Sequence, residues 1–206
     1  VKRVVALSTD KASSPINLYG ATKLASDKLF VAGNAYAGEH ITKFSVVRYG
    51  NVMGSRGSVI PFFNQIKDSG SVPVTHKEMT RFMISLEQGV ELVFHAFEDM
   101  VGGEIYVKKI PSMKVTDLAK VVAPNATQEI IGIRPGEKIH EQMIGSDESI
   151  NTVEFNDHYE ILTNVSEKMK KIRKGYKSVD KNFIFSSKTA IKFSINEFKK
   201  IILKLN

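Results

Sequence analysis

A short apolar run, a long helical segment and a second apolar run follow one another at the start of the chain. Residues 4–7 and 44–48 are apolar stretches typical of strands that are buried on both faces of a sheet. Residues 16–37 lie between them and are expected to form one long helix. Two parallel strands need a connection of this length, because the chain must cross the sheet before it can pair again. The chain is therefore expected to form an α/β fold with a parallel sheet.

Strands and helices continue to alternate further along the chain. A glycine-rich loop at residues 50–57 follows the second buried strand. Beyond it we expect strands at residues 71–75, 104–107 and 129–133, and helices at residues 61–67, from Ser85 onward and at residues 116–122. This alternation predicts a parallel sheet with a smaller region appended to it.

The composition excludes several classes of protein. With 206 residues, of which 42% are hydrophobic, the chain can bury a core, and one compact domain is the default expectation. The absence of cysteine excludes disulfides and thiolate metal sites and favours a cytoplasmic location. The sequence has no apolar run near the roughly 20 residues of a membrane span, so no membrane association is expected. The five histidines lack the spacing of metal ligands, and no metal site is expected.

The positive charge of the chain is concentrated near its C-terminus. The formal net charge is +7, and residues 166–206 hold 12 Lys and Arg against 3 Asp and Glu. The densest part lies at residues 168–174. We interpret residues 166–206 as a basic, helical C-terminal extension with a solvated lysine face, separate from a domain at residues 1–165. Nucleic acid is not an expected partner, because the rest of the chain carries a slight excess of acidic residues.

The residues between the first strand and the first helix have the side chains of a catalytic site. Asp10 and Lys11 follow the strand, and Tyr19 and Lys23 lie four residues apart on one face of the expected helix, which Pro15 is expected to open. An acid, a base and a Tyr–Lys pair at the end of a buried strand predict an active site. A simpler interpretation remains open, in which Asp10 caps a turn and Lys11 is a solvated surface residue.

These residues belong to a longer pattern, Ser-Thr-Asp-Lys-Ala-x-x-Pro-x-Asn-x-Tyr-Gly-x-Thr-Lys, at residues 8–23. In this pattern the chain resembles the extended short-chain dehydrogenase/reductase superfamily and, within it, the inverting UDP-N-acetylglucosamine 4,6-dehydratases. The resemblance continues to about residue 160, through motifs at residues 48–52, 54–59, 79–82, 102–105, 110–113, 133–138, 140–141 and 147–149. It implies the C-terminal part of a Rossmann-like parallel sheet with helices on both faces, plus a small α+β substrate-binding region.

The resemblance implies a separate role for each residue of the motif. The reaction would be dehydration of UDP-N-acetylglucosamine with inversion at C5, with transient reduction of NAD or NADP, for surface polysaccharide or flagellar glycan sugars. Tyr19 would take the proton of the C4 hydroxyl, and Lys23 would make its phenolate accessible. Lys11 would remove the C5 proton, and Asp10 would protonate the departing C6 hydroxyl. Ser8, Tyr19 and Lys23 are the expected cofactor-binding residues.

A second set of residues is expected to bind the UDP-sugar. The two arginines of this set would hold the diphosphate bidentately, although either would also serve as a surface ion-pair partner. The glutamate would accept hydrogen bonds from the uridine ribose, and the threonine would bond to the C4 oxygen of the sugar. The set consists of Thr9, Asn51, Arg81, Arg134 and Glu137.

The sequence lacks the glycine-rich dinucleotide loop at the place where the family has it. That loop follows the first strand of the fold, whereas residues 50–57 lie downstream of the Tyr–Lys pair, where the resemblance implies contact with the nucleotide-sugar. We therefore expect the C-terminal part of a longer, homo-oligomeric enzyme, inactive on its own. Two alternatives remain open: a 4-epimerase of the same superfamily, although simple 4-epimerases lack the Asp–Lys pair, and a non-catalytic nucleotide-sugar-binding module.

Overall fold

The chain forms two compact units in the computed structural model, which describes residues 1–38, 40–162 and 176–205. Each unit draws on three separate stretches of sequence. The first unit comprises Val1–Tyr49, Glu87–Lys109 and Gln142–Phe185, and the second comprises Gly50–Leu86, Ile110–Glu141 and Ser186–Asn206. Within the described ranges, no helix has the length and apolar character needed to cross a membrane.

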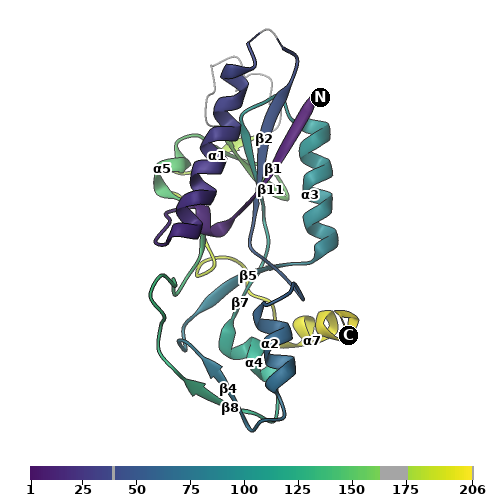
Figure 1. Ribbon diagram of the computed structural model, residues 1–206, viewed down its shortest axis with the longest axis vertical. Coiled ribbons are helices and arrows are strands. Elements are labelled where there is room, and N and C mark those ends of the chain that lie inside the picture. Colours follow the sequence, from purple (N-terminus) through teal and green to yellow (C-terminus); the bar gives the residue numbers. More distant parts are fainter. Residues whose placement is uncertain (39, 163–175, 206) are drawn as a thin grey trace. The chain divides into compact units, whose positions relative to one another are not determined.

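The first unit is built around a six-stranded sheet (Figure 1). Its strands lie in the order β1 (Arg3–Thr9), β2 (Lys43–Tyr49), β6 (Glu104–Lys108), β11 (His158–Leu162), β10 (Thr152–Glu154) and β12 (Lys177–Ser178). The strands β1, β2 and β6 are parallel to one another, and the remaining pairings are antiparallel. The structure thus confirms the predicted parallel sheet and adds an antiparallel half to it.

Helices cover both faces of this sheet. In α1 (Leu18–Tyr36), Phe30 meets Phe44 of β2 with ring centroids 6.3 Å apart. In α3 (Leu86–Asp99), Leu92 packs in a cluster with Val47 of the same strand. Phe44 and Val47 point to opposite faces, because successive side chains of a strand alternate. Figure 1 shows the two helices on either side of the strands, and this arrangement confirms the expected Rossmann-like part.

The second unit is a small α+β region. One of its sheets contains β3 (Asn51–Val52), β5 (Thr80–Ile84) and β7 (Ser112–Lys114), and the other contains β4 (Ser71–Val74) and β8 (Thr127–Ile130). The helices are α2 (Val59–Ile66), α4 (Val115–Val122) and α7 (Ile195–Leu205). They share one apolar core, in which Phe63, Leu118 and Phe198 are almost completely buried. This unit has the small α+β architecture that the resemblance implies.

The helix that carries Tyr19 begins later than predicted. Its first residue is Leu18, and Asn17 is its N-cap, with an Oδ1 that accepts a hydrogen bond from the Gly20 N–H at 2.8 Å. Pro15 therefore precedes the helix rather than opening it. The reason is that a capping side chain satisfies an N–H of the first turn, and proline cannot provide this.

Within residues 176–205 the structure has one helix, at the end of that range. The predicted boundary at residue 165 and the densest basic stretch lie in residues 163–175, outside the described residues. After them come β12 and β13 (Phe185–Ser186), which pairs with β9 (Gln142–Ile144), the strand before the short helix α5 (Ser146–Ser149). The predicted helix is present as α7.

Candidate active site

A tight turn at the end of β1 carries the predicted acid and base. Asp10 opens the 3-10 turn η1 (Asp10–Ala12), and Thr9 is the N-cap of that turn. Asp10 is completely buried, and its Oδ1 accepts hydrogen bonds from Thr9 Oγ1 at 3.0 Å and from Lys11 Nζ at 3.1 Å. Its other oxygen, Oδ2, is buried and has no hydrogen-bond partner among the described residues. Because a buried polar atom without a partner is costly, this oxygen is available to a bound molecule.

The first turns of α1 lie against this turn. The Lys23 Nζ donates a hydrogen bond to the Leu7 carbonyl of β1 at 2.8 Å, which holds its ammonium group at the strand. Tyr19, one helical turn earlier, is about half exposed. At Gly20 a Cβ atom would overlap the Lys11 carbonyl oxygen, so only glycine allows the helix to come this close. The structure therefore brings the Tyr–Lys helix and the Asp–Lys turn together.

Two polar side chains at the same ends of β1 and β2 complete the surroundings. Ser8 is buried, and its hydroxyl has no partner among the residues that the structure describes. This hydroxyl, with Tyr19 and Lys23, fits the hydrogen-bonding needs of a nicotinamide nucleoside. Tyr49, paired with Thr9 across the two strands, was not predicted. Burial, together with the charge of Tyr19, raises the pKa of Tyr49, so Tyr49 stays protonated close to Tyr19.

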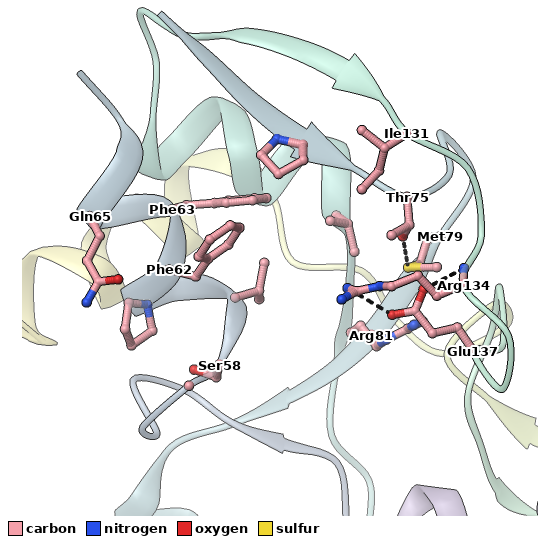
Figure 2. Close-up of a pocket in the computed structure, with 15 residues that line it drawn as sticks. Ser58, Phe62, Phe63, Gln65, Thr75, Met79, Arg81, Ile131, Arg134 and Glu137 are labelled. Carbon is pink, nitrogen blue, oxygen red and sulfur yellow. Dashed lines mark hydrogen bonds and ion pairs between the residues drawn. The ribbon is translucent and has the colours of Figure 1, made fainter. Parts of the chain in front are cut away.

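The second unit contains a cavity of about 520 Å³ (Figure 2). Apolar side chains of α2, among them Phe62 and Phe63, line one side of it. Arg81, Arg134 and Glu137 line the other side. Aromatic rings opposite guanidinium groups suit a ligand that is flat at one end and anionic at the other.

The charged side chains of the cavity are held in different ways. The Arg81 guanidinium is largely buried, and its Nη1 donates to the Thr80 carbonyl at 2.8 Å and to the Ile139 carbonyl at 3.2 Å. Arg134 is exposed and forms an ion pair with Glu137 at 3.1 Å. Two backbone carbonyls therefore hold Arg81, and its Nε also lies 4.0 Å from Glu141 Oε1. Arg134 and Glu137 are held by each other.

The structure brings together three of the five predicted substrate-binding residues. Arg81, Arg134 and Glu137 share the cavity. Asn51 begins β3, where its Oδ1 is buried without a hydrogen-bond partner in the described part of the chain. Thr9 belongs to the first unit and donates its hydroxyl hydrogen to Asp10.

Sequence reasoning missed the apolar side of the cavity. The helix α2 was expected, but no function was predicted for its residues. Phe62 is 43% exposed while its neighbour Phe63 is buried, so the helix presents one aromatic ring to the core and another outward. The signal in the sequence was the pair of adjacent aromatic residues, Phe62 and Phe63, in the helix that follows the glycine-rich loop, because one helix face can bury only one of them. Thr75, Met79 and Ile131 complete the lining from other segments.

No group of three or more histidine or acidic side chains in the described ranges could hold a metal ion. We therefore assign no residue as a metal ligand.

Comparison with known proteins shows which family the chain belongs to. The family model described as "Polysaccharide biosynthesis protein" matches residues 1–163. The inverting UDP-N-acetylglucosamine 4,6-dehydratase of Campylobacter jejuni is 52% identical over 95% of this chain and 64% of that protein. The UDP-glucose 4-epimerase of Rickettsia rickettsii is 38% identical over 100% of this chain and 62% of that protein.

A solved structure agrees with this result. The X-ray structure of Pen from Bacillus thuringiensis superimposes with a TM-score of 0.89 at 36% identity and covers 100% of this chain and 64% of that chain. The chain thus spans less than two thirds of the length of each protein described here. The resemblance predicted from the motifs is confirmed by the Campylobacter relative. Because the family model matches well over half of the residues of this chain, the chain belongs to the polysaccharide biosynthesis protein family.

Proposed function

We propose that this protein dehydrates UDP-N-acetylglucosamine to a UDP-4-keto-6-deoxy-N-acetylhexosamine, with inversion at C5 and with NAD or NADP as a transiently reduced cofactor. The observation that carries the proposal is the Asp10–Lys11 pair at the end of β1, in contact with the helix of Tyr19 and Lys23. The relative named as an inverting 4,6-dehydratase supports the same reaction. The product would supply surface polysaccharide or flagellar glycan sugars.

Tyr19 and Lys23 serve the oxidation at C4. Tyr19 Oη accepts the proton of the C4 hydroxyl, and the ammonium of Lys23 favours the phenolate that this requires. The bond from Lys23 to the Leu7 carbonyl fixes that ammonium at β1. When bound, NAD or NADP supplies reversible hydride transfer, and the residues that would hold its nicotinamide end are Ser8, Tyr19 and Lys23.

Lys11 and Asp10 serve the elimination of water. In the ionised pair Lys11 carries the proton, and its transfer across the 3.1 Å hydrogen bond to Asp10 creates a neutral amine and a carboxylic acid. Lys11 then takes the C5 proton, and Asp10 gives its proton to the C6 hydroxyl. The C5–H and C6–O bonds break, a C5–C6 double bond forms, and water leaves. C6 then takes up the hydride that left C4, and C5 takes a proton from solvent on its opposite face, which gives the 4-keto-6-deoxy product with C5 inverted. The free Oδ2 of Asp10 leaves one carboxyl oxygen for the substrate.

The cavity of the second unit supports binding of the UDP moiety. Arg81 and Arg134 would pair with the diphosphate, and Phe62 would stack on the uracil ring. Glu137 would accept hydrogen bonds from the ribose, after exchanging part of its pairing with Arg134. Thr9 and Asn51 would bond to the sugar; the unpartnered Oδ1 of Asn51 supports this role.

The proposal is tested by the mass of the product. The purified protein, expressed in the full length that its gene encodes, is incubated with UDP-N-acetylglucosamine and NAD or NADP. We expect a UDP-sugar lighter by one water molecule. A product of unchanged mass would instead indicate a 4-epimerase, the activity named for the Rickettsia relative. Binding of UDP without any product would indicate a non-catalytic binding module, and either result would refute the proposal.

A further inference from the structure

The segment at residues 186–193, called here the C-terminal strap, joins the second unit beyond the part of the chain that the family model matches. It runs along β7 through backbone hydrogen bonds: the Ser112 N–H donates to the Ile191 carbonyl at 2.8 Å, and the Phe193 N–H donates to the Ser112 carbonyl at 3.0 Å. The Ser112 hydroxyl donates to the Ser187 carbonyl at 2.7 Å. The strap is therefore an integral part of this unit.

One hydroxyl group of the strap contacts two segments that flank the cavity. Ser187 is completely buried, and its Oγ accepts a hydrogen bond from the Glu141 N–H at 2.9 Å. The same Oγ lies 2.7 Å from Thr80 Oγ1 and donates to the Thr80 carbonyl at 3.2 Å. His140 extends the network, with its Nδ1 2.8 Å from Thr80 Oγ1. Ser187 thus joins β5 to the segment around His140 and Glu141.

These two segments are the ones that hold Arg81. Its guanidinium donates to the Thr80 carbonyl and to the Ile139 carbonyl, one from each segment. The Thr80 carbonyl accepts from both Arg81 and Ser187. The Thr80 N–H donates in turn to the Ile139 carbonyl at 3.0 Å. A shift of either segment would therefore move the guanidinium group in the cavity.

The strap itself is held firmly at its end. Lys192 Nζ donates to the carbonyls of Ser187, Lys188 and Ala190 at 2.7 to 2.9 Å, which closes the strap into a compact turn. Beyond it, α7 places Phe198 in the core shared with α2 and α4. This anchorage fixes the position of the Ser187 hydroxyl.

We propose that Ser187 is a positioning residue that orients Arg81 toward the diphosphate of a nucleoside-diphosphate ligand. This inference rests on the proposed function, because it takes the cavity of Arg81 as the UDP site. Ser187 does not touch the ligand. It acts through the backbone of Thr80 and of the segment at residues 139–141.

The inference is tested by titrating UDP into the Ser187→Ala variant and following binding calorimetrically. Loss of the hydroxyl leaves the Glu141 N–H without its acceptor, and we expect UDP to bind about tenfold more weakly. In the dehydration assay KM rises by a similar factor, and kcat changes by less than about twofold. The matched control is Thr189→Val, because Thr189 is an exposed strap residue whose hydroxyl bonds to Ser186 within the same turn; its UDP affinity stays at the parental value.

A double variant separates positioning from general damage. In an Arg81→Met background, Ser187→Ala should weaken UDP binding no further, because the two residues act as one unit. Lys192→Met removes the donor to the Ser187 carbonyl but leaves the Ser187 hydroxyl and its partners in place, so it loosens the strap and should weaken binding about threefold. It also provides the test if Ser187→Ala does not fold.

Parental UDP affinity in folded Ser187→Ala, or additive losses in the double variant, would overturn the inference, as would a parent protein that binds no UDP. Failure of this inference can be distinguished from failure of the proposed reaction. In that case Ser187→Ala still weakens UDP binding, while UDP-N-acetylglucosamine yields no dehydrated product.

Discussion

The turn after β1 and the cavity lined by α2 are assembled in opposite ways. All predicted catalytic residues lie within residues 8–23, and local contacts place them, such as the Asn17 cap and the bond from Lys11 to Asp10. The cavity takes its side chains from residues 57–65, 73–81, 115 and 131–137, and its Arg81 depends on the distant Ser187. The residues proposed to act on neighbouring atoms of the sugar thus come from one short segment, residues 8–23. A cavity that encloses a large ligand needs several segments.

The largest expected effect is on the chemistry of the first region. Replacing Lys11 by Met removes the base proposed to take the C5 proton, and the dehydration rate should fall about 100-fold or more. The rate is measured from product formation by mass spectrometry. Lys28→Met, an exposed change on α1, is the control and should leave the rate unchanged. A rate for Lys11→Met within a few-fold of the parent would remove Lys11 from the mechanism.

The next effect concerns the long-range support of α1. Arg48 and Asp27 form a buried ion pair at 3.0 Å, and Asp27 lies four residues after Lys23 on the same face of the helix. Asp27→Ala leaves the buried Arg48 short of one partner, and unfolding in urea should show a loss of about 3 kcal/mol. Lys120→Ala, which breaks the exposed pair with Asp117, should cost less than about 1 kcal/mol. Equal small losses would mean that α1 needs only its local contacts.

Two helical glycines provide a sharper test of local placement. A Cβ at Gly20 would overlap the Lys11 carbonyl oxygen, whereas Gly89 in α3 has open space around it. Gly20→Ala should lower the free energy of unfolding by about 1–3 kcal/mol and reduce the dehydration rate. Gly89→Ala should raise it by about 0.5–1 kcal/mol, because glycine is unfavourable inside a helix. If both changes stabilise the protein, the backbone at Gly20 does not lie against the Lys11 carbonyl closely enough to require glycine.

The smallest effect is a pH dependence in the first unit, away from the motif. Burial alone lowers the pKa of His158, but its bonds to Glu160 and Asp157 and their charges outweigh burial, so the pKa is raised above 6.5. The resulting stability is fully present below the unfolded value and is lost as pH rises through the folded pKa. Urea midpoints over about pH 5 to 8 should therefore decline with rising pH, and less so in Glu160→Gln. An identical slope in the variant would exclude this pair as the cause.

The sequence allowed much more to be predicted about the first region than about the second. The Asp–Lys turn and the Tyr–Lys helix are contiguous, so spacing alone brought their residues together. The error at Pro15 arose because the capping bond of Asn17 depends on side-chain geometry. The role proposed for Ser187 could not be predicted, because it depends on contacts with residues that lie far away in the chain.

The division between chemistry and binding is tested most directly by UDP titration of two variants of the protein, Lys11→Met and Arg81→Met. The account predicts that Lys11→Met binds UDP as tightly as the parent although it forms no dehydrated product. It also predicts that Arg81→Met binds UDP about tenfold or more weakly, because one charge-assisted pair to the diphosphate is lost. Equal loss of UDP affinity in both variants, or unchanged affinity in Arg81→Met, would contradict the account.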